Sequence, residues 1–260
     1  MTFPVYLRFG GVSIPPHPFF ECLAYAVGFG VYLSLRKRIG DVVSVDARWW
    51  VIAAATVGAA CGCRLLGILE TPPNAWHVIG SGKTIVGGLV GGWIAVEWIK
   101  RHFGVTVATG DLLAIPLALG IATGRIGCFL TGLADQTYGT VTTLPWGVDF
   151  GDGVRRHPTQ LYEIVFLLGL AALLWRMLRA PHSTGDVFKT FMIAYMGWRF
   201  VIDFWKQDAT FGTLSAIQWT CVAVLAVYHN DLGRILKTLL GWQTNRVQDN
   251  PHAQVGATHL

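Results

Sequence analysis

The chain has 260 residues, of which 53% are hydrophobic and only 13% are charged, and its mean hydropathy is +0.48. Soluble domains carry about 25% charged residues, so this composition excludes an ordinary soluble domain and favours a protein whose outer surface is covered by lipid. The formal net charge of +5 is less informative than the placement of the charges, and we expect no nucleic-acid partner.

Seven apolar stretches follow one another along the chain, and each is long enough, or nearly so, to cross a bilayer core of about 30 Å. They cover Phe19–Leu35, Trp49–Leu69, Thr84–Ile99, Asp111–Leu130, Thr159–Leu178, Val187–Trp205 and Ala216–Leu232. The sequence therefore predicts an all-α integral membrane protein with about seven transmembrane helices. We expect a single polytopic membrane domain over residues 1–242 with an outer loop at about 131–156, and a disordered cytoplasmic tail over 243–260.

Basic residues in the loops and at the ends of the apolar stretches are divided unequally between the two sides, 12 against 5. The richer side holds Arg36, Lys37, Arg38, Arg48, Lys100, Arg101, Arg176, Arg179, Lys189, Arg234, Lys237 and Arg246. The poorer side holds Arg8, Lys83, Arg155, Arg156 and Lys206. Because cytoplasmic loops of membrane proteins are enriched in Lys and Arg, we expect the N-terminus outside and the C-terminus in the cytoplasm.

Five cysteines are present, an odd number, and most lie inside apolar runs. Cys61 and Cys63 lack the spacing of a zinc-ligand pair, so we interpret the cysteines as small apolar fillers. For Cys128 a reactive thiol is the alternative interpretation. The sequence leads us to expect no metal site and no cofactor.

Three arginines lie within apolar stretches, which costs at least about 2.5 kcal/mol each at mid-bilayer and marks them as candidates for a functional site. They are Arg64, Arg125 and Arg199. Each follows the cytoplasmic start of its stretch by a rise of roughly 18–23 Å, so all three are expected in the outer half of the bilayer. The anion that lives there is a lipid phosphate, which arginine binds bidentately. A structural ion pair or a side chain that snorkels to the interface is the alternative for each.

Polar residues also enter the fifth stretch from the outside, ending in Glu163, which is a candidate counter-ion for one of the arginines. Tyr195, Arg199 and Asp203 are spaced four residues apart and share one helix face. Asp203 is therefore either a structural partner of Arg199 or part of the site. The glycine run that includes Gly87 and Gly88 lacks the context of a nucleotide-binding loop, and close helix packing is its favoured interpretation.

Several segments resemble the prolipoprotein diacylglyceryl transferase family. They are DLLAIPLALGIATGRIGCFLTG from Asp111 to Gly132, RHPTQLYE from Arg156 to Glu163, Gly62-Cys63-Arg64-Leu65, the glycine run, and Tyr195 to Phe200 followed by Ile202-Asp203-Phe204. They occur in the order expected for the family, and the resemblance covers roughly residues 15–235.

The resemblance implies a fold of seven spans with the N-terminus outside, in the bacterial cytoplasmic (inner) membrane. It implies transfer of the diacylglyceryl group of phosphatidylglycerol to the lipobox cysteine of a prolipoprotein signal peptide, with release of glycerol 1-phosphate. Arg125 and Arg199 are expected to bind the lipid headgroup and to stabilise the leaving phosphate. The expected substrate-binding residues are Arg64, Gly87, Gly88, Gly124, Gly127, Gln160, Tyr162, Glu163 and Tyr25.

The chain departs from the family pattern at several polar positions. Val86 stands where the family places a histidine, and Cys128 and Thr131 replace two asparagines. Because the reaction needs a thiolate, another base is required, and His157 is the leading candidate ahead of Glu163 and Glu21. A structural hydrogen bond at the start of the helix is the alternative for His157.

Three other functions stay open at this point. One is a related reaction on another lipid or acceptor. The others are a non-enzymatic lipid-binding or scaffolding membrane protein, and a transporter, although the paired interrupted helices typical of transporters are not visible.

Overall fold

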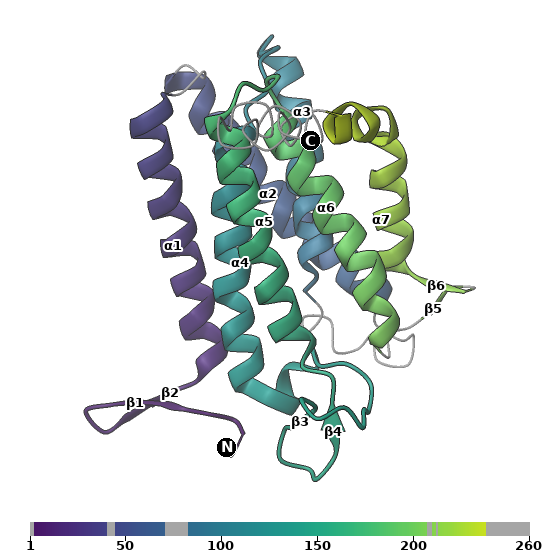
Figure 1. Ribbon diagram of the computed structural model, residues 1–260. Helices are drawn as coiled ribbons and strands as arrows, with labels where there is room; N and C mark the ends of the chain where they lie inside the picture. The colour runs from purple at the N-terminus through teal and green to yellow at the C-terminus, as the bar shows by residue number, and fades with distance from the viewer. Residues whose placement is uncertain (1–2, 41–44, 71–82, 207–209, 212, 238–260) are drawn as a thin grey trace, which may run out of the picture.

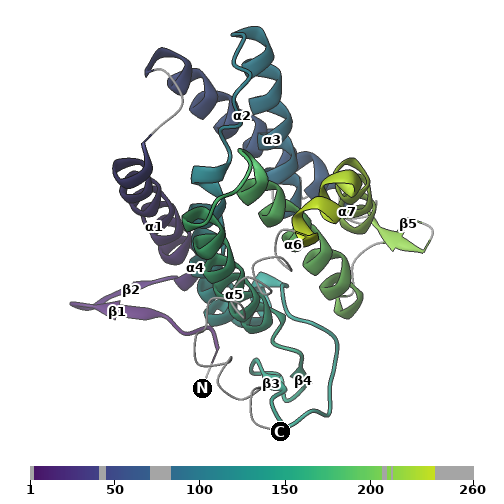
Figure 2. The ribbon, with the colours of Figure 1, turned by 45° about the horizontal axis from the view of Figure 1, so that its top comes forward.

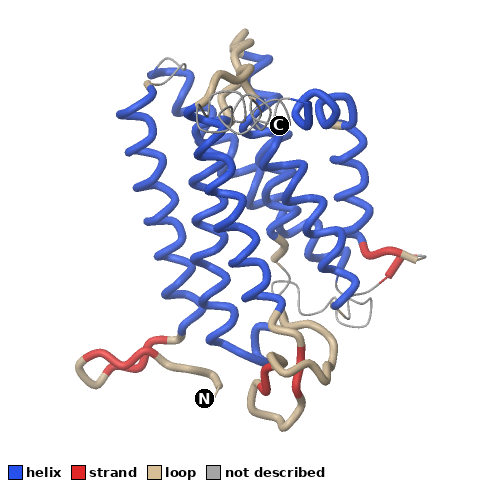
Figure 3. The backbone as a smooth tube through the Cα atoms, viewed as in Figure 1, coloured by secondary structure: helices blue, strands red, loops and turns tan. Residues whose placement is uncertain are grey.

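The computed structural model describes residues 3–40, 45–70, 83–206, 210–211 and 213–237, and helices make up most of this part of the chain (Figure 3). Seven α-helices run between two ends of a bundle and alternate in direction (Figure 1). They are α1 (Pro16–Ile39), α2 (Val45–Glu70), α3 (Ile85–His102), α4 (Asp111–Thr131), α5 (Thr159–Arg179), α6 (Asp186–Ile202) and α7 (Ala216–Val227). Two 3₁₀ turns, η2 (Gly132–Asp135) and η3 (Asp203–Trp205), continue α4 and α6.

Four of the described helices are long and apolar enough to cross a bilayer: α1, α2 from Ala47, α4 together with η2, and α5. The helix α3 carries more charge at its end, whereas α6 has 17 residues and α7 has 12. The predicted helical membrane class is thus confirmed, and each of the seven apolar stretches overlaps a different one of these helices. The number of spans and their orientation stay predictions.

Short antiparallel hairpins lie at one end of the bundle only, the lower end in Figure 3. They pair β1 (Leu7–Phe9) with β2 (Val12–Ile14), β3 (Val148–Asp149) with β4 (Arg155–Arg156), and β5 (Thr210–Phe211) with β6 (Leu214–Ser215). The predicted outer loop at 131–156 therefore contains η2 and a small hairpin. Hairpin strands of two or three residues cannot bury a face of their own, so they depend on the helix ends to which they are attached.

The helices α2 and α3 form a pair that stands beside the rest of the bundle (Figure 2). Their backbones meet because both carry glycine at the contact. A Cβ on Gly62 would lie 2.2 Å from the carbonyl oxygen of Gly87, and a Cβ on Gly91 would lie 2.3 Å from that of Gly58. Small residues at such contacts let membrane helices approach closely. The favoured interpretation of the glycine run therefore agrees with the geometry of Gly87 and Gly91.

The central helix α4 packs against α1 on one side and α5 on the other. Its contact with α1 also depends on a glycine, since a Cβ on Gly127 would lie 2.7 Å from the Cβ of Phe20. The buried core continues through α5, α6 and α7 and includes Leu167, Leu174 and Tyr195.

Helix ends show why the chain turns where it does. Ser215 caps α7 in a reciprocal capping box with Gln218, and Thr84 caps α3 by accepting a hydrogen bond from the backbone N–H of Gly87. Such caps satisfy backbone groups that the first helical turn leaves without partners. Basic residues occupy the last turns of α1, α3 and α5, which all end at the upper end of the bundle in Figure 1.

Two predicted boundaries differ from the structure. The sixth stretch was expected to reach Trp205, but α6 ends at Ile202 and η3 completes it. The seventh was expected to reach Leu232, but α7 ends at Val227 and a turn at Tyr228 separates it from a further helical segment at 229–237. The predicted tail, 243–260, lies outside the described residues.

Candidate functional site

A buried ion pair joins α4 to α5 near the lower end of the bundle. Nε of Arg125 lies 2.9 Å from Oε2 of Glu163, and Nη2 of Arg125 donates a hydrogen bond of 3.2 Å to Oε1. Both residues are almost fully buried, with 6% and 2% of their surface exposed. The carboxylate thus lies against two nitrogens of the guanidinium, and within the described residues only Nη2 makes a hydrogen bond of good geometry to it.

Arg199 on α6 meets the same carboxylate from the opposite side. Its Nη1 donates to Oε2 of Glu163 at 3.4 Å, and its Nη2 donates to Oδ1 of Asp203 at 3.2 Å. Asp203 in turn accepts a 2.5 Å hydrogen bond from the hydroxyl of Ser215 at the start of α7. The predicted pairing of Arg199 with Asp203 is therefore present.

Tyr195 completes the set, since its hydroxyl donates a 2.7 Å hydrogen bond to Oε1 of Glu163. Glu163 thus accepts from α4 and from two positions on α6. We call Arg125, Glu163, Tyr195, Arg199 and Asp203 the arginine cluster. It contains two guanidiniums and two carboxylates, which offset each other in charge, and such compensation is what makes buried charges tolerable.

The arginine cluster nevertheless retains unused hydrogen-bond donors. Nη1 of Arg125 faces only the thiol of Cys128, at 4.0 Å. Nε of Arg199 is buried and makes no hydrogen bond within the described residues. A guanidinium has five N–H groups, so each arginine can hold its carboxylate and still donate to a second anion.

His157 lies just before α5, six residues before Glu163 in the sequence. Among the described residues, its side chain has a hydrogen-bond partner outside the arginine cluster. Its Nδ1 is 3.2 Å from the hydroxyl of Tyr162, which also accepts a 2.9 Å hydrogen bond from Nε1 of Trp146. The backbone N–H of His157 donates to Thr140, and its carbonyl accepts from Gly139. His157 is half-buried, so it is accessible while its backbone is fixed by its hydrogen bonds to Gly139 and Thr140.

Gln160 lies on the first turn of α5 and is 1% exposed. Its Nε2 donates to the hydroxyl of Thr137 at 3.1 Å, whereas its Oε1 is buried and makes no hydrogen bond within the described part of the chain. A buried amide oxygen without a donor is costly, and it is available to a hydroxyl of a ligand.

The hairpin β3–β4 is fastened by a second ion pair. Arg156 donates two hydrogen bonds of 2.8 Å to Asp152, and these bonds lower the pKa of the Asp152 carboxyl. The same guanidinium lies 5.1 Å from the centre of the Tyr138 ring. The hairpin that precedes His157 is therefore held in one shape.

The remaining predicted site residues lie elsewhere. Arg64 on α2 is exposed, whereas Arg125 and Arg199 are buried together. Tyr25 on α1 is 69% exposed, and its hydroxyl donates to Glu21 at 3.2 Å. A substrate-binding role for these residues stays a prediction.

The glycines expected at the site lie in helix contacts. Gly87 faces the backbone of α2, and Gly88 lies looser against it, 3.6 Å from the Cβ of Cys63 when a Cβ is added. Gly124 and Gly127 lie on the side of α4 that meets α1. Their geometry explains helix packing directly, and a role in substrate binding is untested. Val86, at the position where the resemblance leads to a histidine, is 1% exposed and belongs to the apolar core.

Sequence reasoning missed one group of polar side chains next to the arginine cluster. His17, Cys128 and Asp135 bring a ring nitrogen, a thiol and a carboxylate together, with every pair of these atoms within 4.8 Å. Cys128 was interpreted as a packing residue, and the other two were not singled out. Their position at helix ends, where polar residues are ordinary, gave no signal in the sequence.

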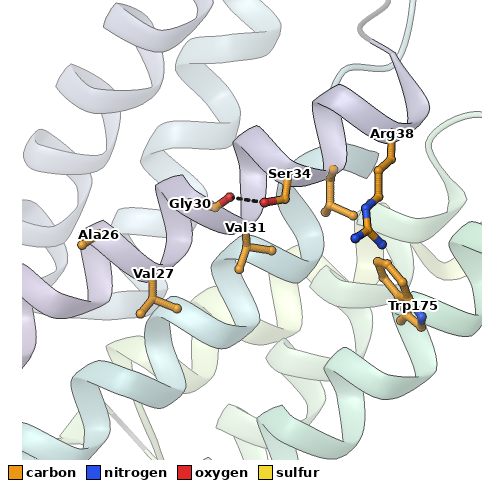
Figure 4. Close-up of a pocket in the computed structure, with 8 residues that line it drawn as sticks. Ala26, Val27, Gly30, Val31, Ser34, Arg38 and Trp175 are labelled. Atoms are coloured by element: carbon orange, nitrogen blue, oxygen red, sulfur yellow. Dashed lines mark hydrogen bonds between the residues drawn. The ribbon is translucent and has the colours of Figure 1, made fainter.

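An apolar groove of about 490 Å³ lies along α1 where it faces α5 (Figure 4). Val27, Val31 and Leu35 line it, and the side chain of Arg38 points toward Trp175 at one end. The groove occupies the part of α1 remote from His17, so it is separate from the arginine cluster.

Comparisons with known proteins agree on one family. A family model described as "Prolipoprotein diacylglyceryl transferase" matches residues 4–229. A curated protein of Bordetella parapertussis named phosphatidylglycerol–prolipoprotein diacylglyceryl transferase is 30% identical over an alignment that covers 85% of this chain and 91% of that protein. A protein of the same name from Geobacter sulfurreducens is 32% identical over 82% of this chain and 85% of its own length. Another from Pseudomonas paraeruginosa is 31% identical over 74% and 73%.

Proposed function

Because this chain belongs to the prolipoprotein diacylglyceryl transferase family, we propose that it transfers the diacylglyceryl group of phosphatidylglycerol to the lipobox cysteine of a prolipoprotein signal peptide. Glycerol 1-phosphate is the second product. The observation that carries this proposal is the convergence of Arg125 and Arg199 on Glu163 in a buried site with unused donors.

We propose that all seven helices cross a bacterial inner membrane, with the N-terminus outside and the C-terminus in the cytoplasm. The alternating helix directions support this arrangement (Figure 1). The basic last turns of α1, α3 and α5 gather at one end, which the positive-inside rule assigns to the cytoplasm. The arginine cluster and the hairpins then belong to the outer half.

The arginine cluster is proposed to bind the phosphate of the lipid headgroup. Nε of Arg199, and Nη1 of Arg125 beyond its long 4.0 Å contact with Cys128, supply hydrogen bonds to phosphate oxygens, while Glu163 keeps the two guanidiniums at fixed positions. In the reaction, the acceptor sulfur forms a bond to the glycerol carbon, and the bond from that carbon to the phosphate oxygen breaks. The electron pair goes to the phosphate, where preorganised guanidiniums stabilise the added charge.

The acceptor thiol must lose a proton, and His157 is the proposed base. It is half-buried, and its Nδ1 contacts Tyr162, which orients the ring. Glu163 is less suited because Arg125, Tyr195 and Arg199 all bind its oxygens. Glu21 is more exposed than Glu163, and its carboxylate lies 3.6 Å from Nζ of Lys83.

The test is a reconstituted assay with the full chain in phosphatidylglycerol liposomes and a synthetic lipobox peptide, read by peptide mass. We expect a diacylglyceryl increment on the cysteine. Arg125→Ala and Arg199→Ala are expected to lose at least about 100-fold in turnover, the effect typical of removing one preorganised donor. Arg176→Ala, which removes an exposed arginine at the opposite end of α5, is the matched control and should retain turnover.

A peptide that stays unmodified by the wild-type chain, while a family enzyme modifies it in parallel, would contradict the proposal. One observation favours a second candidate, a non-enzymatic lipid-binding protein: the charges of the arginine cluster already offset each other within the chain. That candidate predicts no turnover by the wild-type chain, with phosphatidylglycerol binding that is reduced in Arg199→Ala.

A further inference from the structure

Three side chains that ligate metal ions meet beside the arginine cluster. His17 opens α1, Cys128 lies one turn before the end of α4, and Asp135 ends η2. Their ligand atoms all lie within 4.8 Å of one another. They are the one such group among the described residues, although the three come from distant parts of the sequence.

His17 and Asp135 form an ion pair whose N–H direction is off the line to the carboxylate oxygen. Nδ1 of His17 lies 2.6 Å from Oδ1 of Asp135, yet this buried nitrogen makes no hydrogen bond of acceptable geometry. Two ligand atoms that approach each other off the hydrogen-bonding direction can both point at a third atom. In a tetrahedral zinc site they would separate to about 3.3 Å, because each lies about 2.0 Å from the ion.

The surroundings hold the three ligands in place. Thr137 donates a 2.6 Å hydrogen bond to Oδ2 of Asp135, which leaves Oδ1 for a metal. Nη1 of Arg125 lies 4.0 Å from Sγ of Cys128, so a positive charge faces the sulfur that would be a thiolate. Hydrogen bonds to the ligands are the usual support of a metal site and fix ligand orientation.

We propose that His17, Cys128 and Asp135 bind a zinc ion whose fourth position receives the thiolate of the acceptor cysteine. Nitrogen, sulfur and oxygen ligands suit zinc, and three protein ligands with one open position characterise a catalytic rather than a structural zinc site. The second half of this proposal rests on the proposed transferase function.

The exposure of the three ligands and their position next to the arginine cluster agree with an open fourth coordination position on the zinc ion. The His17 side chain is 43% exposed, whereas Cys128 and Asp135 are covered, so the group has one open side. Arg125 joins the metal group to the arginine cluster through its Cys128 contact. An acceptor sulfur bound here therefore lies next to the guanidiniums proposed to hold the phosphate.

The chemistry balances without a redox step. When the acceptor thiol binds zinc, it would lose its proton to His157, the base proposed above, since a coordinated thiol is deprotonated. The sulfur then forms a bond to the glycerol carbon, and the electron pair of the breaking carbon–oxygen bond leaves with the phosphate. Zinc keeps its charge throughout. This role supplies a thiolate in a chain where Val86 replaces the family histidine.

The first test measures metal content. The full chain, purified in detergent and equilibrated with Zn²⁺, is expected to retain one zinc per chain after gel filtration. Cys128→Ser and Asp135→Asn, both nearly isosteric, are expected to weaken zinc binding at least about 100-fold. Cys22→Ser removes an exposed thiol from the helix that carries His17 and serves as the matched control, with unchanged zinc binding. Gel-filtration profiles show whether each variant is folded.

The second test replaces zinc by Co²⁺ and follows the near-ultraviolet sulfur-to-cobalt absorption band. We expect one band from Cys128, absent in Cys128→Ser, and about twice the intensity when a lipobox peptide is added. A peptide with serine in place of cysteine should leave the band unchanged. Zinc binding that is absent, or that survives in folded Cys128→Ser and Asp135→Asn chains, would overturn the metal site. A band unaffected by the cysteine peptide would overturn the acceptor role.

These outcomes separate from those of the proposed function. A chain that binds zinc through Cys128 but never modifies the peptide in liposomes would reject the transferase reaction and keep the metal site. A chain that binds no zinc and modifies the peptide equally well with and without a chelator would reject the metal site and keep the transferase reaction.

Discussion

Two regions of this protein join helices by opposite means. In the pair α2–α3 the backbones touch because side chains are missing at Gly58, Gly62, Gly87 and Gly91. Between α4, α5 and α6 the contact is made by large charged side chains that bind one another in the core. Lipid offers no hydrophobic drive for helices to associate, so close packing and polar contacts are the two available sources of affinity. Packing gives a rigid pair, whereas the polar contact also gives a site.

The largest effect is expected from breaking the polar contact. Glu163→Ala leaves two buried guanidiniums without their shared carboxylate, and an uncompensated buried charge destabilises a protein by about 3–5 kcal/mol. The measurement is thermal unfolding in detergent, followed by circular dichroism. Asp152→Asn, which breaks an ion pair in the exposed hairpin, is the control and should change stability much less, because solvent screens that pair. Equal effects of the two substitutions would contradict the structural weight given to Glu163.

A smaller effect is expected from breaking the glycine contact. Gly62→Ala places a Cβ 2.2 Å from the carbonyl oxygen of Gly87, so α2 and α3 must move apart. Overpacking of this kind costs about 1–3 kcal/mol.

The matched control for that substitution is Gly169→Ala on α5, where an added Cβ meets nothing within 4 Å. It should be neutral or stabilising by up to about 1 kcal/mol through helix propensity. Unfolding of the two variants in the same detergent gives the comparison, and a Gly62→Ala chain as stable as Gly169→Ala would contradict the contact.

The smallest effect concerns an ion pair outside both regions. Lys189 and Arg234 bind Asp231 at 2.7 Å each, and these hydrogen bonds lower the pKa of the Asp231 carboxyl. A lowered pKa in the folded state stabilises the protein above the unfolded value of about 3.9, and this stability is lost as the pH falls through the folded pKa.

Asp231→Asn should therefore lower the free energy of unfolding at neutral pH by less than about 1 kcal/mol, since the pair is partly solvated. This loss should appear as a slightly lower melting temperature. The difference from wild type should shrink as the pH falls below about 4 and vanish once the pH is below the folded-state pKa of Asp231. Melting curves at a series of pH values provide the check, and a difference that grows toward acid would contradict the sign.

The sequence revealed those features that contrast with their surroundings. Arginines inside apolar runs are conspicuous, and Arg125, Arg199 and Glu163 do meet. Arg64 is equally conspicuous, but it lies exposed on α2. The sequence did not separate it from the other two arginines, because the position of a residue along a helix does not give the direction of its side chain. The glycine run predicted close packing but not its partner on α2.

Other features depend on distances that the sequence does not contain. His17 and Asp135 lie at helix ends, where polar residues need no explanation, and Cys128 looks like a small apolar residue. Only the packing of α1 against α4 brings these three residues together. The closest signal in the sequence was the cysteine three residues after Arg125.

The arginine cluster also has a consequence for how the chain is made. Its charges lie on helices that leave the ribosome one after another, and Glu163 is synthesised 38 residues after Arg125. The helix α4 thus reaches the translocon with an arginine whose counter-ion does not yet exist, and such a helix inserts poorly by itself. The length of the segment between α4 and α5 sets the time for which Arg125 has no counter-ion. Lengthening that segment would therefore reduce the efficiency of membrane insertion even where the folded structure is unchanged.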